Sequence, residues 1–330
     1  MSLKTLMLAG AALTLTVSAA SAQTKTIAID GSSTVFPVSE ALAEEFQKST
    51  KGQVRVTVGI SGTGGGFKKF CRGETDISNG SRPILKSEID ECKKAGIEFI
   101  EMPLAFDALT VAVSPKNNFI GECISVAQLK KIWEPAAQGK VMNWSDVDPK
   151  WPNQKMTLFG AGSDSGTFDY FTEAVTGKAK SSRGDYTGSE DDNVLVTGIE
   201  KDQNSLGYIP YAYYAPHAKQ MKALAVDGGK GCVKPSLENV TAGTYNPLAR
   251  PLFIYVSKKS AEKPEVQQYV EFAFTKGAAL VTEVKYLALP QDAYSQALKH
   301  FKERRVGSVF GGVPEVGVSI QELMKRDAKS

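Results

Sequence analysis

Three short turns rich in glycine, serine and threonine could bind a small anion. Each turn follows an apolar run with strand-like alternation and precedes apolar residues at helical spacing. Unpaired N–H groups at a helix N-terminus attract anions, and small residues let an anion approach that backbone. One such turn is usually only a helix cap. Three together predict one small tetrahedral oxyanion, held among the turns at 31–34, 59–66 and 161–167.

The third turn could instead carry a nucleophile, because Ser165 lies in a Ser-Asp-Ser-Gly sequence that resembles hydrolase motifs. Both histidines, His217 and His300, follow Ser165, so the order His, Asp, Ser is impossible. The G-x-S-x-G elbow is absent, since Ser163 stands two residues before Ser165. Phe67 occupies the place of the third glycine of a dinucleotide fingerprint, and the same run lacks the Lys-Ser/Thr of a P-loop. The sequence therefore favours a binding site over covalent catalysis or a nucleotide site.

The residues around the turns indicate which elements hold them. Strand-like runs occur at 26–29 and 54–58, and another strand ends at 158–159. Each turn is followed by helical spacing, as in the apolar residues of 38–46. Repeated strand, turn and helix units predict an α/β fold with parallel strands. In such sheets ligands lie at the carboxyl ends of strands, beside helix N-termini.

Two further apolar runs predict a connection between two domains. The run 97–117 indicates two strands in near succession, and the run 247–260 indicates a similar strand near the other end. Two crossings of the chain between domains explain both runs, with the C-terminal helices returning to the first domain. We therefore expect a first lobe of residues 23–108 and 250–330 and a second lobe of residues 109–249.

Residues 1–22 have the pattern of a secretory signal peptide. Lys4 gives a charged start, residues 6–17 are apolar, and Ala20-Ser21-Ala22 offers a cleavage site. The apolar run is too short to span a bilayer. Without these residues 308 of the 330 remain, and the formal charge falls from +3 to +2 because only Lys4 is lost. So weak a charge predicts no nucleic-acid or membrane surface. We expect an exported protein.

The chain has four cysteines, at positions 71, 92, 123 and 232. In an exported chain an even number favours disulfides over metal, and there is no C-x-x-C pair. Three pairings are possible. We expect Cys71–Cys92, because these residues flank one short unit, and Cys123–Cys232 by elimination. No metal site is predicted, since the two histidines are isolated in the sequence.

Together the motifs IDGSSTVFPVSEALAEEF, VGISGTGGGFKKFCRGETDISNGSRPI and GAGSDSGTFDYF resemble the periplasmic phosphate-binding protein of high-affinity phosphate ABC transporters. SRGDYTGSEDDNVLV is similar to the cyanobacterial-type branch of that family. The resemblance spans the whole chain after the leader. It implies a two-lobed type II periplasmic binding protein, an α/β fold with two parallel-rich mixed sheets joined by a two-strand hinge. It also implies capture of inorganic phosphate in the periplasm, delivery to an ABC transporter permease in the inner membrane, and neither enzyme activity nor a cofactor.

The resemblance also assigns phosphate contacts to backbone N–H groups and hydroxyls at three helix starts. Carried over one by one, the matching residues are Ser33, Thr34, Val35, Thr63, Ser165, Gly166 and Thr167. Thr63 stands at the position of a family serine, whereas the last three match the family's Ser-Gly-Thr directly.

Two departures from the family pattern change the expected charges of the site. Ser81 stands where the better-known branch has an Asp that accepts the ligand's proton and rejects sulfate, and Ala161 stands where it has an Arg. We therefore expect Arg82 to supply the missing guanidinium, entering the cleft bidentately. The alternative is a surface salt bridge of Arg82. Arg183, in the long polar loop 177–193, is a weaker candidate.

A proton acceptor must also come from elsewhere. Asp164 is the first candidate, because it lies inside the third turn. Its alternative role is an N-terminal cap for the following helix. Asp185 or Asp191 could act from the long loop.

Other functions stay open at this point. Another oxyanion, such as arsenate, phosphite or sulfate, could be the ligand. A secreted phosphatase or hydrolase would need a metal site or a triad, and the sequence shows neither. A receptor that binds phosphate without transport could carry the same motifs. We expect a monomer whose partners are inorganic phosphate and the permease.

Overall fold

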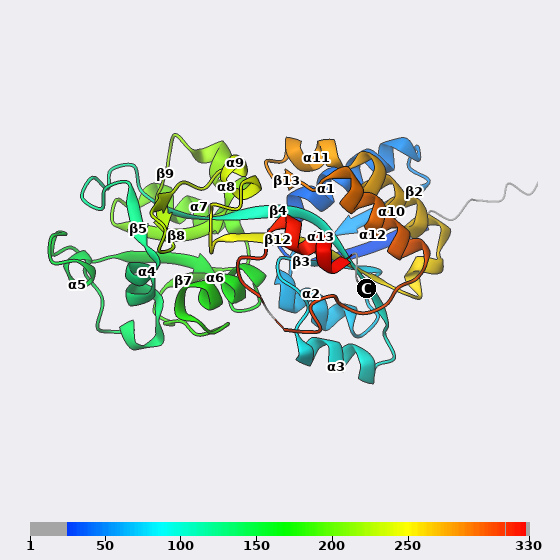
Figure 1. The fold of residues 1–330 in the computed structure, drawn as a ribbon, viewed down its shortest axis with the longest axis horizontal. Helices are drawn as coiled ribbons and strands as arrows, with labels where there is room; N and C mark the ends of the chain where they lie inside the picture. Colours follow the sequence, from blue (N-terminus) through cyan, green and yellow to red (C-terminus); the bar gives the residue numbers. More distant parts are fainter. Residues whose placement is uncertain (1–24, 314, 328–330) are drawn as a thin grey trace, which may run out of the picture.

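The computed structural model describes residues 25–313 and 315–327, which fold into a two-lobed α/β protein (Figure 1). The predicted signal peptide, residues 1–22, lies outside the described residues. Within those residues no helix has the length and hydropathy that a membrane span needs.

One mixed sheet of ten strands extends through both lobes. Its main path is β2 (Val54–Val58), β1 (Lys25–Gly31), β3 (Ile77–Gly80), β12 (Ala249–Ser257), β4 (Phe99–Val113), β8 (Ser205–Pro210), β6 (Thr157–Ala161) and β7 (Thr187–Ser189). Two short strands pair with β4, namely β9 (Lys222–Ala223) and β13 (Leu287–Ala288). The pairs of β1 with β2 and β3, and of β6 with β7 and β8, are parallel, as the repeated strand, turn and helix units predicted.

Two long antiparallel strands, β4 and β12, connect the lobes. β4 pairs with β12 from Phe99 to Ala108 and with β8 from Leu109 to Val113, so it changes partner between Ala108 and Leu109. Every residue of β4 is buried. Both strands run from one lobe towards the other in Figure 1. They are the two predicted crossings, and because the sheets of the two lobes share β4, they form one hydrogen-bonded path.

The first lobe combines the N-terminal elements with the C-terminal helices. Its helices are α1 (Phe36–Ser49), α2 (Gly62–Phe70), α3 (Lys86–Lys94), η3 (Ser260–Glu262), α10 (Pro264–Lys276), α11 (Ala278–Glu283), α12 (Gln291–Lys302) and α13 (Ile320–Asp327). α1 begins with Pro37 in its first turn and buries Val38, Leu42 and Phe46 on one face. α10 packs on β1 and α12 packs on β4, so the chain's end returns to the first lobe.

The second lobe contains the middle of the chain. Its helices are α4 (Val126–Trp133), η1 (Pro135–Ala137), α5 (Trp144–Val147), α6 (Gly166–Thr176), α7 (Asp192–Lys201), α8 (Tyr211–Tyr214), η2 (Ala215–His217) and α9 (Leu237–Thr241). Its core is aromatic: Phe171 stacks on Tyr208 with ring centroids 3.8 Å apart, and Trp133 meets both rings edge-on. This packing fixes α6 against the sheet.

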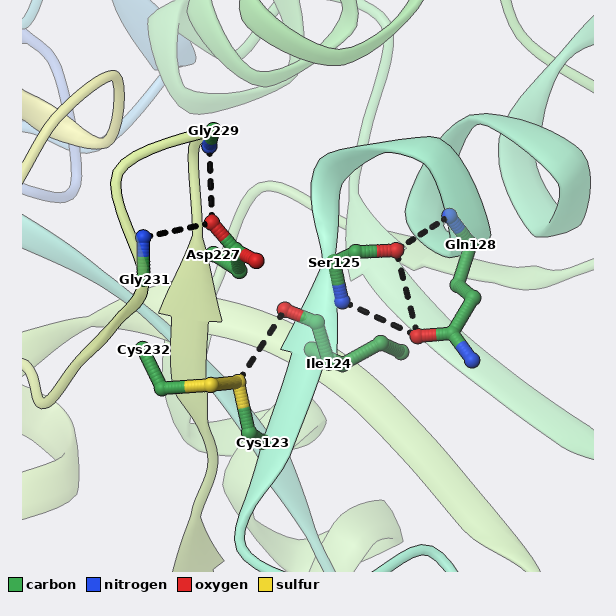
Figure 2. Close-up of a disulfide and its surroundings, with 8 residues drawn as sticks. All are labelled: Cys123, Ile124, Ser125, Gln128, Asp227, Gly229, Gly231 and Cys232. Atoms are coloured by element: carbon green, nitrogen blue, oxygen red, sulfur yellow. Dashed lines mark hydrogen bonds between the residues drawn. A yellow bond between two sulfur atoms is a disulfide. The ribbon is translucent and has the colours of Figure 1, made fainter.

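Both predicted disulfides are present. Cys71–Cys92 joins the end of α2 to α3, with a sequence separation of 21 residues. Cys123–Cys232 joins β5 (Cys123–Ser125) to β11 (Cys232–Val233), the outer strands of a small sheet whose middle strand is β10 (Ala225–Asp227). Figure 2 shows this bridge beside the start of α4, where Ser125 and Gln128 form a reciprocal cap. The second disulfide therefore closes a peripheral unit of the second lobe.

Candidate functional site

The three predicted turns meet between the lobes, and their hydroxyls lie in contact. The Oγ1 atoms of Thr34 and Thr167 are 2.9 Å apart, and Thr63 Oγ1 is 3.0 Å from Ser81 Oγ. Gly166 lies between these pairs, since a Cβ on it would be 2.5 Å from both Thr63 Oγ1 and Ser81 Oγ. We call Thr34, Thr63, Ser81 and Thr167 the hydroxyl cluster. All four are fully buried.

Glycines allow the turns to approach backbone to backbone. The N–H of Gly64 donates to the carbonyl of Asp164 at 2.9 Å, which joins the second turn to the third. Gly62 has φ +76°, and a Cβ there would be 2.5 Å from the same carbonyl oxygen. A Cβ on Gly66 would be 2.5 Å from Gly31 Cα, which joins the second turn to the first. A larger residue at these positions would hold the turns apart.

Helices α1, α2 and α6 all begin at this point. The Ser165 hydroxyl caps α6 by accepting the N–H of Thr167 at 3.1 Å. At α1 the N–H of Val35 donates to the Ser32 hydroxyl at 3.3 Å. The first N–H groups of a helix have no partner within it, so the convergence of three helix starts concentrates donors and positive potential. The arrangement suits an anion.

A buried arginine that the sequence analysis missed lies in this cluster. Arg250 Nη2 donates to Thr167 Oγ1 at 2.8 Å and to Thr34 Oγ1 at 3.2 Å, and its Nη1 donates to the Gly166 carbonyl at 3.2 Å. Its side chain has no exposed area. The available signal was a charged residue inside the apolar run of β12, because a buried strand rarely holds an unpaired charge. Arg250 thus places a guanidinium at the hydroxyl cluster.

Arg250 is held by a carboxylate on the neighbouring strand. Asp107 on β4 is its register partner on β12, and Asp107 Oδ2 accepts from Nη2 at 3.0 Å and from Nε at 3.2 Å. Burial raises the pKa of Asp107, and the charge of Arg250 offsets only part of that effect. The pair therefore places a fixed guanidinium at the junction of the lobes.

A second carboxylate, Asp192, is buried beside the first turn. It is the first residue of α7 and is 1% exposed. Burial raises its pKa to about 7, although a hydrogen bond with the Ser33 hydroxyl and the charge of Arg250 act in the opposite direction. Its neighbour Asp191 caps α7 instead, accepting the N–H of Asn193 at 3.0 Å. The sequence analysis considered Asp191 for the site but not Asp192.

The environment of Arg82 differs from both predictions, which were a guanidinium facing the ligand and a surface salt bridge. Arg82 is 2% exposed, which rules out a surface salt bridge. Its Nε donates to Asp169 on α6 at 2.6 Å, and both terminal nitrogens donate to Glu88 on α3 at 2.8 Å. The bidentate partner is therefore Glu88, and Arg82 links the first lobe to the second beside Ser81. The structure gives no support to Arg82 as a free cationic partner for a ligand.

The remaining charged candidates lie away from the hydroxyl cluster. The side chain of Asp164 is 41% exposed and pairs with Lys68 at 3.0 Å. Ser165, rather than Asp164, is the N-terminal cap of α6. The exposure of Asp164 makes it a poor proton acceptor for a buried ligand. Arg183 is buried elsewhere in the second lobe, where it donates to the carbonyls of Ile132 and Val141 and pairs with Asp185. Neither Arg183 nor Asp185 contacts the cluster in the part of the chain described.

Several direct contacts hold the lobes together around the site. Tyr213 on α8 donates its hydroxyl to the Ser33 carbonyl at 3.1 Å. The Lys68–Asp164 and Arg82–Asp169 ion pairs also join elements of opposite lobes. In the described residues no group of three or more His, Cys, Asp or Glu could hold a metal ion. The turns of the two lobes thus meet in direct contact, at a junction rich in hydrogen-bond donors.

Comparison with known proteins decides the family. The model of the PBP superfamily domain matches residues 16–276, most of the chain. This chain belongs to the PBP superfamily. Protein SphX of Synechococcus elongatus is 49% identical to it over 309 residues, covering 93% of this chain and 90% of the relative. The phosphate-binding protein PstS of Staphylococcus saprophyticus is 36% identical over 272 residues, covering 81% of each chain.

Solved structures agree with this membership of the PBP superfamily. The crystal structure of a possible phosphate-binding protein from Planctomyces limnophilus is 46% identical, with a TM-score of 0.63, covering 86% of this chain and 99% of that one. An ABC-type phosphate transport receptor from Vibrio cholerae is 23% identical and has a TM-score of 0.60, covering 80% of this chain and 100% of that one. The latter shows a shared fold alone.

Proposed function

We propose that this chain captures inorganic phosphate in the periplasm and delivers it to the permease of an ABC importer. The observation that carries the proposal is the convergence of three helix starts, the hydroxyl cluster and Arg250 between two lobes. The names of PstS and of the Planctomyces protein support phosphate as the ligand. The chain is a binding protein rather than an enzyme, as its family membership shows.

The chemistry of recognition is hydrogen bonding and charge. An oxyanion among the turns accepts hydrogen bonds from Thr34, Thr63 and Thr167, whose hydroxyls otherwise bond to one another, to Ser81 or to Arg250. Backbone N–H groups at the starts of α2 and α6 add donors without a mobile side chain. Hydrogen bonds to a charged group are each worth about 1.5–3 kcal/mol. Arg250 contributes the matching positive charge from the strand pair that joins the lobes.

Closure of the lobes follows from the position of the site. Thr34 and Thr63 belong to the first lobe, whereas Thr167 belongs to the second, so a bound anion bridges both. A ligand that contacts both lobes favours the closed arrangement. We propose a first lobe of 23–108 and 250–330 and a second of 109–249, because β4 changes partner at Ala108. Bending of β4 and β12 then opens the cleft.

The location and partners follow from the same proposal. Export through the leader places the protein in the periplasm, where both disulfides are stable. The permease receives the closed, loaded protein, which acts as a monomer. Size-exclusion chromatography with light scattering tests the monomer directly, and a mass near that of a dimer would contradict it.

Isothermal titration calorimetry of phosphate-free protein tests the proposed ligand. We expect one saturable site for phosphate, a comparable site for arsenate, and much weaker binding of sulfate. Thr167→Val should weaken phosphate binding about 10- to 100-fold, because it removes a hydrogen bond to a charged ligand. Thr275→Val is the matched control, because Thr275 is an exposed residue of α10 whose hydroxyl donates to the Glu271 carbonyl. No saturable binding of phosphate would overturn the proposal.

A further inference from the structure

Arg82 and Asp169 form a buried ion pair between the lobes that the recognition of an anion does not explain. Arg82 follows β3 in the first lobe, and its Nε donates to Asp169 Oδ2 on α6 of the second lobe at 2.6 Å. The two side chains are 2% and 3% exposed. The Lys68–Asp164 pair also joins the lobes, but its side chains are 57% and 41% exposed. Exposed ion pairs contribute little free energy, so the buried pair is the one whose loss should matter.

This buried pair lies beside the hydroxyl cluster in both lobes. Arg82 is the next residue after Ser81, and Asp169 is two residues after Thr167 in the first turn of α6. Arg82 donates to Asp169 and Glu88, and among the described residues no hydrogen bond joins it to the cluster. Arg82 therefore affects the cluster through the chain segments that it joins.

The two carboxylates that bind Arg82 belong to different lobes. Glu88 lies on α3 of the first lobe and accepts from both terminal nitrogens of Arg82 at 2.8 Å. Separation of the lobes would therefore leave Arg82 paired with Glu88. Asp169 would lose the guanidinium, but water entering between the lobes would hydrate its carboxylate. Because neither charge is then buried without a partner, the Arg82–Asp169 contact can break and form again as the lobes move.

The carboxylate of Asp169 depends on Arg82 while the lobes are in contact. Its Oδ1 atom has no hydrogen-bond partner among the described residues, and the Nζ of half-exposed Lys180 lies 4.0 Å from it. A buried carboxylate that loses its guanidinium destabilises the arrangement that buries it. The arrangement with the lobes in contact should therefore need this pair, whereas an open arrangement should not.

We propose that Arg82 and Asp169 form a latch that is made when the lobes close, so that phosphate affinity depends on this pair although neither side chain contacts the anion. This inference rests on the proposed function. Both are positioning residues, because Arg82 follows the strand end that carries Ser81 and Asp169 lies in the helix start that carries Thr167. A ligand that requires closed lobes binds more weakly when the closed arrangement is less populated. The latch thus raises affinity without changing which anion is preferred.

Titrations of Asp169→Asn and Asp164→Asn with phosphate and arsenate test the latch. Asp169→Asn keeps the size of the side chain, removes its charge and leaves Arg82 paired with Glu88. We expect it to weaken phosphate binding about 10- to 100-fold, mainly through faster dissociation in stopped-flow experiments, and to leave the ratio of the phosphate and arsenate affinities within about threefold. Asp164→Asn makes the same change in the exposed pair and should leave phosphate affinity within about threefold of wild type. Equal affinities of the two variants would overturn the proposal.

Urea unfolding with and without phosphate separates a latch from an ion pair that only supports the fold. Under the proposal the lobes of the phosphate-free protein are open, so Asp169→Asn should unfold at the same urea midpoint as wild type. With saturating phosphate the variant should have the lower midpoint, because a ligand stabilises a protein according to its affinity. An equal loss of stability in both conditions would show a purely structural pair and overturn the latch.

The outcomes also separate this inference from the proposed function. Wild-type protein that binds no phosphate overturns both. Wild-type protein that binds phosphate, with Asp169→Asn binding it as tightly, overturns the latch alone. If the variant does not fold, crystal structures of wild type with and without phosphate decide. Arg82 Nε within about 3 Å of Asp169 only in the phosphate complex supports the latch, whereas the same contact without phosphate, or an Arg82 nitrogen within about 3.5 Å of a phosphate oxygen, overturns it.

Discussion

Arg250 and Asp107 face each other across the two strands that join the lobes, and they hold the guanidinium against the hydroxyl cluster. Their backbones are register partners, and Asp107 Oδ2 lies 3.0 Å from Arg250 Nη2. The same Nη2 donates to Thr34 and Thr167, which come from opposite lobes. A single residue of the hinge therefore contacts both sides of the cleft. Because Arg250 lies on a strand that joins the lobes, its positive charge stays at their junction whichever lobe moves.

Removal of Arg250 should strongly weaken phosphate binding and also destabilise the fold. We expect Arg250→Met to make phosphate binding weaker by about 2–5 kcal/mol, because a fully desolvated charge contact is lost. It should lower the free energy of unfolding by about 3–5 kcal/mol, because Asp107 is left buried without its partner. Calorimetry and urea unfolding measure the two effects.

Two further variants separate charge from packing at this pair. Arg250→Met with Asp107→Leu should recover most of the stability but none of the affinity, since the buried carboxylate is gone while the anion still lacks a cation. Arg55→Met removes an exposed arginine from β2 and should leave both quantities within about 0.5 kcal/mol of wild type. Recovery of phosphate affinity in the double variant would contradict the assigned role.

A methyl group at Gly166 should block the site without altering its charge. Its Cβ would be 2.5 Å from the hydroxyls of Thr63 and Ser81, so the turns must separate. Overpacking of this kind costs about 1–3 kcal/mol, and we expect Gly166→Ala to weaken phosphate binding by about 10- to 100-fold. Gly184→Ala is the control, since its Cβ would meet only the Gln138 side chain at 3.5 Å. Equal affinity of the two variants would show that the anion lies elsewhere.

The buried carboxyl of Asp192 should make stability depend on pH in a particular direction. Its pKa rises from 3.8 to about 7 on folding, so the native state holds more protons between these values than the unfolded chain does. Without ligand, the unfolding free energy should therefore fall as pH rises from about 4 to about 7, and level off above that. A shift of this size corresponds to about 4 kcal/mol. Asp192→Asn should remove this dependence.

Urea unfolding of wild type and Asp192→Asn across that pH range measures the effect as a difference. Taking the difference cancels the contributions that other carboxyls make to the pH dependence of stability. Asp76 and Asp185, whose pKa values are lowered, are two of these. We expect the variant to gain stability over wild type as pH rises. Parallel curves for the two proteins would contradict a buried, titrating Asp192.

The disulfide next to the second turn should contribute to stability rather than to recognition. Cys71–Cys92 closes a loop with a sequence separation of 21 residues, and its removal should cost about 3 kcal/mol. We expect Cys71→Ser with Cys92→Ser to lower the midpoint of urea unfolding and to leave phosphate affinity within about threefold of wild type. A large loss of affinity at temperatures where the variant is folded would show that α2 moves without the bridge.

Much of the site could be predicted from the sequence because its parts are local. Each turn is a continuous run of small residues between a strand and a helix, and both disulfides follow from few alternatives. Hydrophobic patterns likewise located the two strands that connect the lobes. These features depend on residues near one another in the chain.

The charged residues of the site could not be placed in the same way. Arg250 and Asp107 are 143 residues apart, and their pairing depends on the register of two strands. Arg82 was expected at the ligand, but Glu88 and Asp169 bind it, and Asp169 lies 87 residues away. Asp191 and Asp192 are neighbours, and their roles depend on the residue at which α7 begins. Sequence patterns do not fix helix ends that closely.

A crystal soaked in arsenate tests the central claim most directly, because anomalous scattering locates the arsenic atom. We predict a single strong peak between the lobes, with the hydroxyl oxygens of Thr63 and Thr167 and a terminal nitrogen of Arg250 within about 3 Å of arsenate oxygens. A peak at another place, or none at saturating arsenate, would contradict the account.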